Sequence, residues 1–250
     1  MNEAGLTPEL PNFISLLGNT FKNTPWLQFL VIWENVVFSL IIAGIILIFV
    51  YFAGHKRKLI PGRMQSAAEL IVGLLDEFVS GIIGQKRGRK YVPFVGTLFI
   101  YILFMNLFGL VPFMKPATSS WSTTLALALC VFVYVQYTAI KELGVFGYMD
   151  HLAGKPRGAL AFTIVIPVMM FVLHLITELI KPVSLSLRLR SNIWGDDVLL
   201  AVLGGFGLTG FPLLFFNTLM ALLTAIVQAL VFCILTTIYF ALVLPEEETG

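Results

Sequence analysis

The chain has too little charge for a soluble protein of its length. Of its 250 residues only 12% are charged, whereas hydrophobic residues make up 58% and the mean hydropathy is +0.92. Soluble domains carry about 25% charged residues. So few charges cannot cover a folded core with polar surface, and we therefore infer an integral membrane protein. The net charge of +2 is too small for a nucleic-acid-binding surface, so no nucleic-acid partner is expected.

Cysteine is scarce as well. Cys130 and Cys233 both lie in apolar runs, which excludes a disulfide framework and gives no metal-ligand spacing. The sequence contains neither the HExxH motif of zinc proteases nor the glycine-rich loop of P-loop nucleotide-binding proteins. We therefore expect no cofactor, no metal and no catalytic residues. An intramembrane metalloenzyme is an alternative that only stoichiometric bound zinc would revive.

Long uncharged runs are what the sequence has instead. A helix needs about 20 apolar residues to cross roughly 30 Å of hydrocarbon, and the alternating pattern of a β-barrel is absent. The runs predict an all-α integral membrane protein with a single membrane domain, 1–250. Its expected parts are an outer N-terminal segment, a first span, an amphipathic helix on the inner surface, a transmembrane hairpin and a pair of long inclined helices, at 1–25, 26–53, 63–84, 91–140 and 159–244.

The distribution of Lys and Arg predicts the orientation. Segment 54–90 holds eight of them and loop 141–157 holds three, against Lys22 and Lys115 on the opposite side. Basic loops face the cytoplasm, so the N-terminus should lie outside and the acidic C-terminal tail inside. Both flanks of 63–84 are basic, so this segment should lie along the inner surface. A short re-entrant span is the alternative.

The last uncharged run is too long for one upright helix. It covers 48 residues between Asp197 and Glu246. As a single helix it would measure about 72 Å. Glycines and a proline at 204–212 interrupt it. We therefore expect two long helices joined by a glycine-rich turn, and helices longer than the hydrocarbon is thick must tilt or bend.

Charged side chains nevertheless lie in this half of the chain, where each costs about 2.5–3.5 kcal/mol at the centre of a membrane helix. On the first long helix, polar residues step by three or four and so share one face, which should point away from lipid. We call this face the polar stripe; it comprises His174, Glu178, Lys181, Ser184, Arg188, Asn192 and Asp196. The next helix repeats the spacing with Asn217, Ala221, Thr224 and Gln228. If the helices are antiparallel, the two rows should meet.

Arg188 stands near the middle of the polar stripe. Arginine stays protonated even when buried, so it cannot relay protons, but it attracts a carboxylate and drives off its proton. With titratable neighbours, Arg188 would suit a gate between two aqueous paths. Other members have simpler interpretations: Glu178 and Lys181 as an intrahelical ion pair, His174 and Glu178 as half of a metal site, and Gln228 as a helix-packing contact.

At these residues the sequence resembles a known family. The run KPVSLSLRL at 181–189, followed by Asn192, is similar to the signature of subunit a of the F-type ATP synthase. Further matches extend the resemblance along most of the chain, at 93–99, 106–112, 123–128 and 228–232.

The resemblance implies a non-catalytic stator subunit in lipid, beside a rotating ring of c subunits and peripheral-stalk b-type subunits, with ATP chemistry on partner subunits. It implies ion translocation through two offset half-channels. Arg188 falls on the essential arginine that separates the channels and interacts with the c-ring carboxylate. Asn192 and Gln228 fall on polar positions of the same helix pair, and Asp197 on a position in an access half-channel. We expect H⁺ rather than Na⁺, and a bacterial inner membrane.

Arg190 departs from the family pattern. Many members have Phe-Gly or Phe-Ala where this chain has Arg190 and Ser191. Because Arg190 is two residues from Arg188, it should point to the other side of the helix, and either reach the interface or pair with Asp197.

Ala221 is a second departure, since several members carry a titratable residue there. We hypothesise that His174 and Glu178 take over this relay, on an outer path that they share with Asp197. The remaining ion-path and supporting residues are expected to be Asp196, Lys181, Ser184, Asn217 and Thr224. The alternative function is a secondary ion or solute transporter, which transport of a solute by the purified chain would favour.

Overall fold

The computed structural model of the chain describes residues 33–54, 63–111, 114, 116–152 and 162–244. These residues form helices and connections with no strand among them, which confirms the all-α fold. Four helices are long and apolar enough to cross a membrane: α3 (Glu34–Gly54), α7 (Trp121–Leu152), α8 (Phe162–Gly204) and α9 (Phe211–Val243). A fifth apolar helix, α6 (Val92–Phe108), has 17 residues. The outer segment 1–25 lies outside the described residues.

The predicted amphipathic segment forms α4 (Arg63–Ile83), followed by the short α5 (Gln85–Gly88). The helix packs against α6 and α9 with Leu75, Val79 and Ser80 buried. Near α5, the Lys90 ammonium lies 3.2 Å from the Glu142 carboxylate of α7. These contacts attach the surface segment to the helical bundle, while its place on the inner membrane surface stays a prediction.

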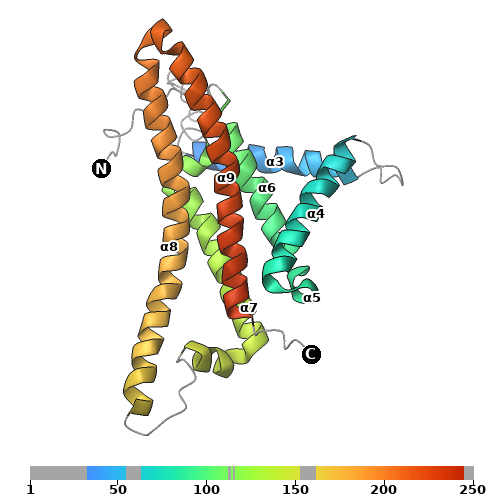
Figure 1. The fold of residues 1–250 in the computed structure, drawn as a ribbon, viewed down its shortest axis with the longest axis vertical. Helices are drawn as coiled ribbons and strands as arrows, with labels where there is room; N and C mark the ends of the chain where they lie inside the picture. Colours follow the sequence, from blue (N-terminus) through green and yellow to red (C-terminus); the bar gives the residue numbers. More distant parts are fainter. Residues whose placement is uncertain (1–32, 55–62, 112–113, 115, 153–161, 245–250) are drawn as a thin grey trace.

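The second half of the chain folds into the long antiparallel hairpin of α8 and α9, which Figure 1 shows in orange and red. Helices of 43 and 33 residues extend about 64 and 50 Å, well beyond roughly 30 Å of hydrocarbon. The turn between them contains η2 (Gly207–Gly210), whose first residue, Gly207, has a φ of 60° that favours glycine. In Figure 1 the hairpin lies crosswise to α3, which supports the inclination predicted from length.

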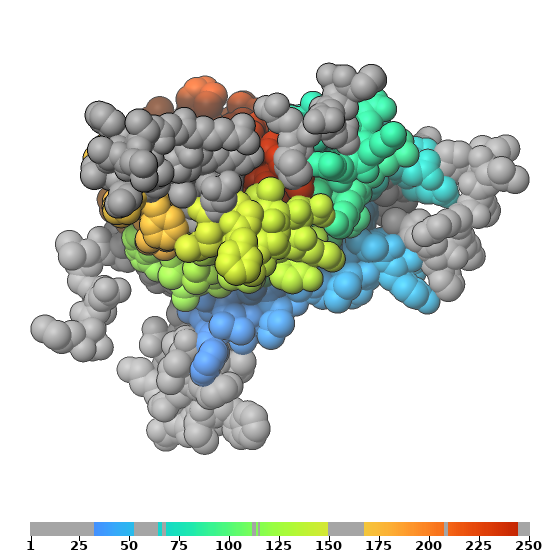
Figure 2. Space-filling model, turned by 90° about the horizontal axis from the view of Figure 1, so that it is seen from below, coloured from blue at the N-terminus to red at the C-terminus, as the bar shows by residue number. Residues whose placement is uncertain are grey.

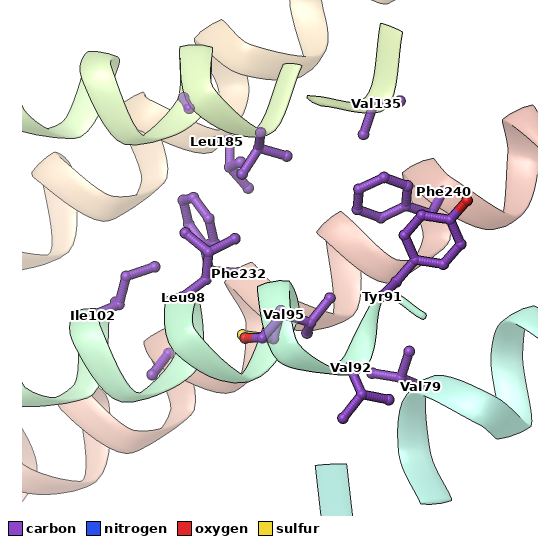
Figure 3. Packing of buried hydrophobic residues seen from close by; sticks show 14 of the residues in the cluster. Val79, Tyr91, Val92, Val95, Leu98, Ile102, Val135, Leu185, Phe232 and Phe240 are labelled. Atoms are coloured by element: carbon purple, nitrogen blue, oxygen red, sulfur yellow. The ribbon is translucent and has the colours of Figure 1, made fainter. Parts of the chain in front are cut away.

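One hydrophobic core joins the hairpin to α4, α6 and α7 (Figure 3). Phe240 of α9 stacks on Tyr91, next to α6, with ring centroids 4.7 Å apart. Phe232 and Leu185 are almost completely buried and pack in the same cluster. Ala229 has no exposed surface, and small residues of this kind let membrane helices approach closely. The core therefore holds α8 and α9 against the α6–α7 hairpin.

α7 bends sharply at Gly144, whose φ of 70° lies in the left-handed region that favours glycine. The predicted hairpin ended at residue 140, but α7 continues to Leu152 beyond the bend. This last part turns across the lower end of the molecule in Figure 1 and occupies the middle of the face in Figure 2. The bend therefore returns the end of α7 towards its own helix.

Gly144→Ala should lower the thermal stability of the protein, because a φ of 70° with a ψ of 164° is a conformation that essentially only glycine adopts, at a cost of about 1–3 kcal/mol for other residues. The added methyl group meets no atom within 4 Å, so only the backbone conformation is tested. Gly147→Ala is the matched control, since its methyl group meets only Leu143, at 3.6 Å. The measurement is the temperature at which the buried Cys233 thiol becomes reactive in a Cys130→Ser background. Equal temperatures for the two variants would contradict the expected strain.

Candidate functional site

A cavity of about 400 Å³ lies between α8, α9 and the connection from α6 to α7. Asp196 and Asp197 line it from α8, and Asn217, Thr224 and Gln228 line it from α9. A polar cavity needs about 10–15 Å³ to hold one water molecule, so this one has room for many. The five polar side chains thus border a space that can hold a chain of water molecules.

The NH₂ groups of two amides in the cavity wall have no protein acceptor within the described part of the chain. Asn217 and Gln228 are both only 4% exposed, and neither Nδ2 of Asn217 nor Nε2 of Gln228 has a hydrogen-bond acceptor there. Buried donors are almost always satisfied in native proteins, by protein groups or by ordered water. These two amides therefore favour a hydrated cavity.

Polar contacts hold the walls of the cavity together. Nδ2 of Asn192 donates to Oε1 of Gln228 over 2.6 Å, which confirms that the polar rows of α8 and α9 meet. On the opposite wall, the Thr118 hydroxyl of η1 (Ala117–Ser119) donates to Oδ1 of Asn106 over 3.1 Å. The second bond attaches the α6–α7 connection to the end of α6 and so fixes the other side of the cavity.

Arg188 lies on the exposed face of α8, together with Ser184 and Asn192. The opposite face is buried and carries Leu185 and Leu189. Among the residues that the structure describes, the Arg188 guanidinium has no hydrogen bond or ion pair. An unpaired charge on a membrane helix is costly, so this face requires water or a carboxylate from another chain.

A second polar group, which we call the inner network, lies nearer the start of α8. Lys181 forms an ion pair with Oε1 of Glu178, and their side chains are only 13% and 14% exposed. Nε2 of Gln136 on α7 donates to Oε2 of Glu178 over 2.8 Å, and the Tyr148 hydroxyl donates to Oε1 of Gln136. The Lys181 ammonium also lies 5.1 Å from the centroid of the Tyr239 ring. The adjoining void measures only about 10 Å³, so this network is closed rather than hydrated.

The structure separates Glu178 from Asp197, which the sequence analysis placed on one path. α8 is a continuous helix, so the two residues lie about 28 Å apart along its axis, with Arg188 between them. His174 lies further still towards the start of α8, where its Nδ1 is 3.0 Å from the Met170 carbonyl oxygen of the same helix. A single outer path through all three residues therefore does not fit the structure.

The side chains beside Ala221 are also different from those hypothesised. Ala221 lines the same cavity as Asp196 and Asp197, whereas neither His174 nor Glu178 does. The hypothesis that His174 and Glu178 replace a titratable residue at this position is therefore wrong on geometric grounds. The structure also adds no further ligand to the half metal site suggested for His174 and Glu178, since the described residues hold no group of three or more metal-binding side chains.

Arg190 turns away from Arg188, as expected, and its guanidinium carbon lies 4.9 Å from the centroid of the Trp121 ring at the start of α7. This contact joins α8 to the start of α7, whereas the reach of Arg190 to the interface stays a prediction. Sequence reasoning missed Trp121, Gln136 and Tyr148, because a single polar or aromatic residue in an apolar helix forms no periodic pattern. Only the packing of α7 against α8 identifies them.

Comparisons with known proteins identify a matching family and several relatives. The family model described as ATP synthase A chain matches residues 36–241. A protein of Protochlamydia amoebophila (strain UWE25) named ATP synthase subunit a is 40% identical over 249 residues, covering 96% of this chain and 91% of the relative. Proteins of the same name from Helicobacter pylori (strain P12) and Helicobacter hepaticus (strain ATCC 51449 / 3B1) are 34% and 37% identical, each covering 84% of this chain and 90% of the relative.

A small hydrophilic thiol reagent should reach a cysteine in the cavity wall. In a Cys130→Ser background, we expect Thr224→Cys to react readily, and additional Ala221→Leu to slow the reaction several-fold by filling the cavity. Thr236→Cys is the control, because Thr236 is completely buried and does not line the cavity. Equal labelling rates at positions 224 and 236 would show that the cavity is closed to water.

Proposed function

The chain belongs to the ATP synthase A chain family, and on that premise we propose that it carries protons across the membrane as subunit a of an F-type ATP synthase. Protons pass through two offset half-channels at the interface with a rotating ring of c subunits. The observation that carries this proposal is Arg188, which lies on the exposed face of a long apolar helix and has no hydrogen bond or ion pair among the described residues. A cavity bordered by polar side chains lies further along the same helix. ATP chemistry belongs to partner subunits.

The cavity is the outer half-channel in this proposal. Water held by Asn217, Thr224 and Gln228 conducts the proton past Asp196 and Asp197. The proton then neutralises a carboxylate of the c-ring beside the exposed face of α8. A neutral carboxyl group can turn towards lipid at far lower cost than a charged one, so proton uptake permits the ring to rotate.

Arg188 separates the two half-channels. After almost a full turn of the ring, the protonated carboxyl group meets the guanidinium, which favours the charged form and drives the proton off. The same fixed charge repels any cation moving directly from one half-channel to the other. Arginine suits this role because it keeps its own proton.

The inner half-channel follows the exposed face of α8 rather than the interior of the chain. The void beside Glu178 is too small for a chain of water molecules, whereas Ser184 and Arg188 are exposed. His174 lies on the same side of Arg188, near the start of the helix, and is the titratable residue of this path. Lys181 is paired with Glu178, so it stabilises the helix and takes no part in proton transfer.

The proposal includes the setting of the subunit. Peripheral-stalk b-type subunits and membrane lipid are its other neighbours, and a bacterial inner membrane is its location. The excess of Lys and Arg in segments 54–90 and 141–157 supports a cytoplasmic C-terminus and an N-terminus outside. The coupling ion is H⁺ rather than Na⁺.

Arg188→Ala should abolish ATP-driven acidification of inverted membrane vesicles that contain the assembled complex, because the gate between the half-channels is lost. Arg190→Ala is the matched control: it removes a cation two residues away that is stacked on Trp121, and it should retain most of the pumping. Normal pumping by Arg188→Ala would overturn the gate and favour a secondary transporter.

The same vesicles identify the ion. A protonophore should abolish the acidification produced by the unaltered complex, with or without Na⁺, because the pumped proton leaks back. Acidification that a protonophore stimulates, or that requires Na⁺, would show that Na⁺ is the transported ion and that H⁺ moves secondarily.

Removing both carboxylates of the cavity should slow proton access from the outer side. We expect the Asp196→Asn, Asp197→Asn double variant to lose most passive proton conduction through membranes stripped of the ATP-hydrolysing sector. Addition of Ala221→Asp should restore part of it, since position 221 lines the same cavity. Ser122→Asp, an exposed site at the start of α7, is the control for added charge. Full conduction by the double variant would place the outer path elsewhere.

A further inference from the structure

We propose that Gln136 and Tyr148 of α7 are positioning residues that hold the Glu178–Lys181 pair and so set the rotation of α8 that presents Arg188 to the c-ring. This inference rests on the proposed function of Arg188. It gives a role to the inner network, which is part of neither the proposed proton path nor the hydrophobic core.

The hydrogen bonds of the inner network form a directed chain. The Tyr148 hydroxyl donates to the carbonyl oxygen of the Gln136 amide, so the amide NH₂ group must point towards α8. That group donates to one oxygen of Glu178 over 2.8 Å, and Lys181 occupies the other oxygen. A buried ion pair is favourable only when further hydrogen bonds satisfy it, and Gln136 supplies one from a different helix. The chain therefore attaches α8 to α7 with a defined orientation.

The bend at Gly144 makes this chain possible. Tyr148 is 12 residues from Gln136, and in a straight helix that separation would be about 18 Å along the axis. No tyrosine hydroxyl could then reach the amide. The left-handed φ of 70° at Gly144 turns the last part of α7 back, so that the hydroxyl and the amide meet.

α8 needs such an attachment because apolar contacts alone define its rotation poorly. It exposes large apolar side chains on several sides, among them Leu179, Ile180 and Leu199. In hydrocarbon these side chains gain nothing by turning inward, so polar contacts and close packing must define the rotation. On the C-terminal side of Arg188, the hydrogen bond between Asn192 and Gln228 defines the rotation. On the N-terminal side of Arg188, the contact of Glu178 with α7 defines the rotation.

The geometry of the helix shows what a loss of this attachment would change. Ten residues separate Glu178 from Arg188, which places Arg188 about 15 Å along and about 80° around the helix. Glu178 can therefore face α7 while Arg188 faces outward. A slip of one residue rotates a helix by about 100°, enough to turn Arg188 from the exposed face towards a neighbouring helix.

An exchange of the two side chains tests the proposal in the assembled complex. Gln136→Glu alone places two carboxylates in contact, and Glu178→Gln alone leaves Lys181 without its counter-ion, so each should lower ATP-driven acidification several-fold. The double exchange keeps one carboxylate in the network and preserves its hydrogen bonds, because the carboxylate on α7 accepts from Tyr148 and from the amide on α8. The Lys181 ammonium then donates to the oxygen of that amide, with the carboxylate one hydrogen bond away. It should restore most of the pumping.

Tyr148→Phe supplies an independent perturbation that removes a single hydroxyl. It should lower pumping and leave the amount of assembled complex unchanged. The matched control is Tyr137→Phe, on the same helix, where the side chain is exposed and its ring contacts Lys141 rather than the inner network. Equal pumping by the two variants would overturn the role of Tyr148.

The rotation of α8 has its own readout. Ser186 is completely buried on the face opposite Arg188, so Ser186→Cys in a Cys130→Ser background should react slowly with a thiol reagent. Gln136→Glu should increase that rate several-fold, and the double exchange should return it to the starting value. A change in pumping with no change in this rate would overturn the positioning role.

The remaining outcomes separate this inference from the proposed function. If the exchange restores the labelling rate but not the pumping, the Glu178 carboxylate itself carries protons, and its role as part of a structural attachment is wrong. If neither recovers while Arg188→Ala is still inactive, the attachment is wrong and the proposed gate stands. If Arg188→Ala pumps normally, the proposed function fails, and the presentation of Arg188 to the c-ring is overturned with it.

Discussion

A guanidinium that keeps its proton lies on a helix whose other exposed side chains are largely apolar, and much of the structure can be understood from the cost of that charge. A charge at the centre of a membrane helix is destabilising by several kcal/mol unless it is paired or hydrated. The chain satisfies the neighbouring cations itself, Lys181 with Glu178 and Arg190 with the ring of Trp121. In the described residues Arg188 has no such partner. The charge that the chain leaves unsatisfied is the one that a carboxylate on another subunit can satisfy.

The two sides of Arg188 differ in the space that they leave for water. Towards the turn of the hairpin, unsatisfied amides and two carboxylates border a cavity of about 400 Å³. Towards the start of α8, Gln136 and Lys181 occupy both oxygens of Glu178 beside a void of about 10 Å³. A subunit that keeps two aqueous paths apart needs this asymmetry, because a continuous file of water past the arginine would let protons leak. In the proposed function, the outer path lies within the chain and the inner path lies at its surface.

Much of this arrangement could be predicted from the periodicity of polar side chains and the length of apolar runs, but some of it could not. The three- and four-residue spacing of polar side chains indicated one face of α8, and the run of 48 uncharged residues indicated a hairpin of long helices. The sequence analysis also placed Glu178 and Asp197 on one path, which they do not share. A helical wheel gives the angle of a side chain but not which neighbouring helix it meets. Glu178 meets α7, whereas Asp197 meets the cavity between α8, α9 and the α6–α7 connection.

The sequence by itself determined the membrane environment, the helical class and the long hairpin, and it singled out Arg188 as a candidate, because these depend on composition, on the length of apolar runs and on the cost of an isolated charge. Only the tertiary structure decided that Asp196 and Asp197 stand beside Ala221, that Arg190 stacks on Trp121, and that Gln136 and Tyr148 hold Glu178. Those contacts join residues far apart in the chain. They exist because a glycine bends α7 and because close packing of small side chains brings four helices together, and neither effect leaves a periodic pattern in the sequence.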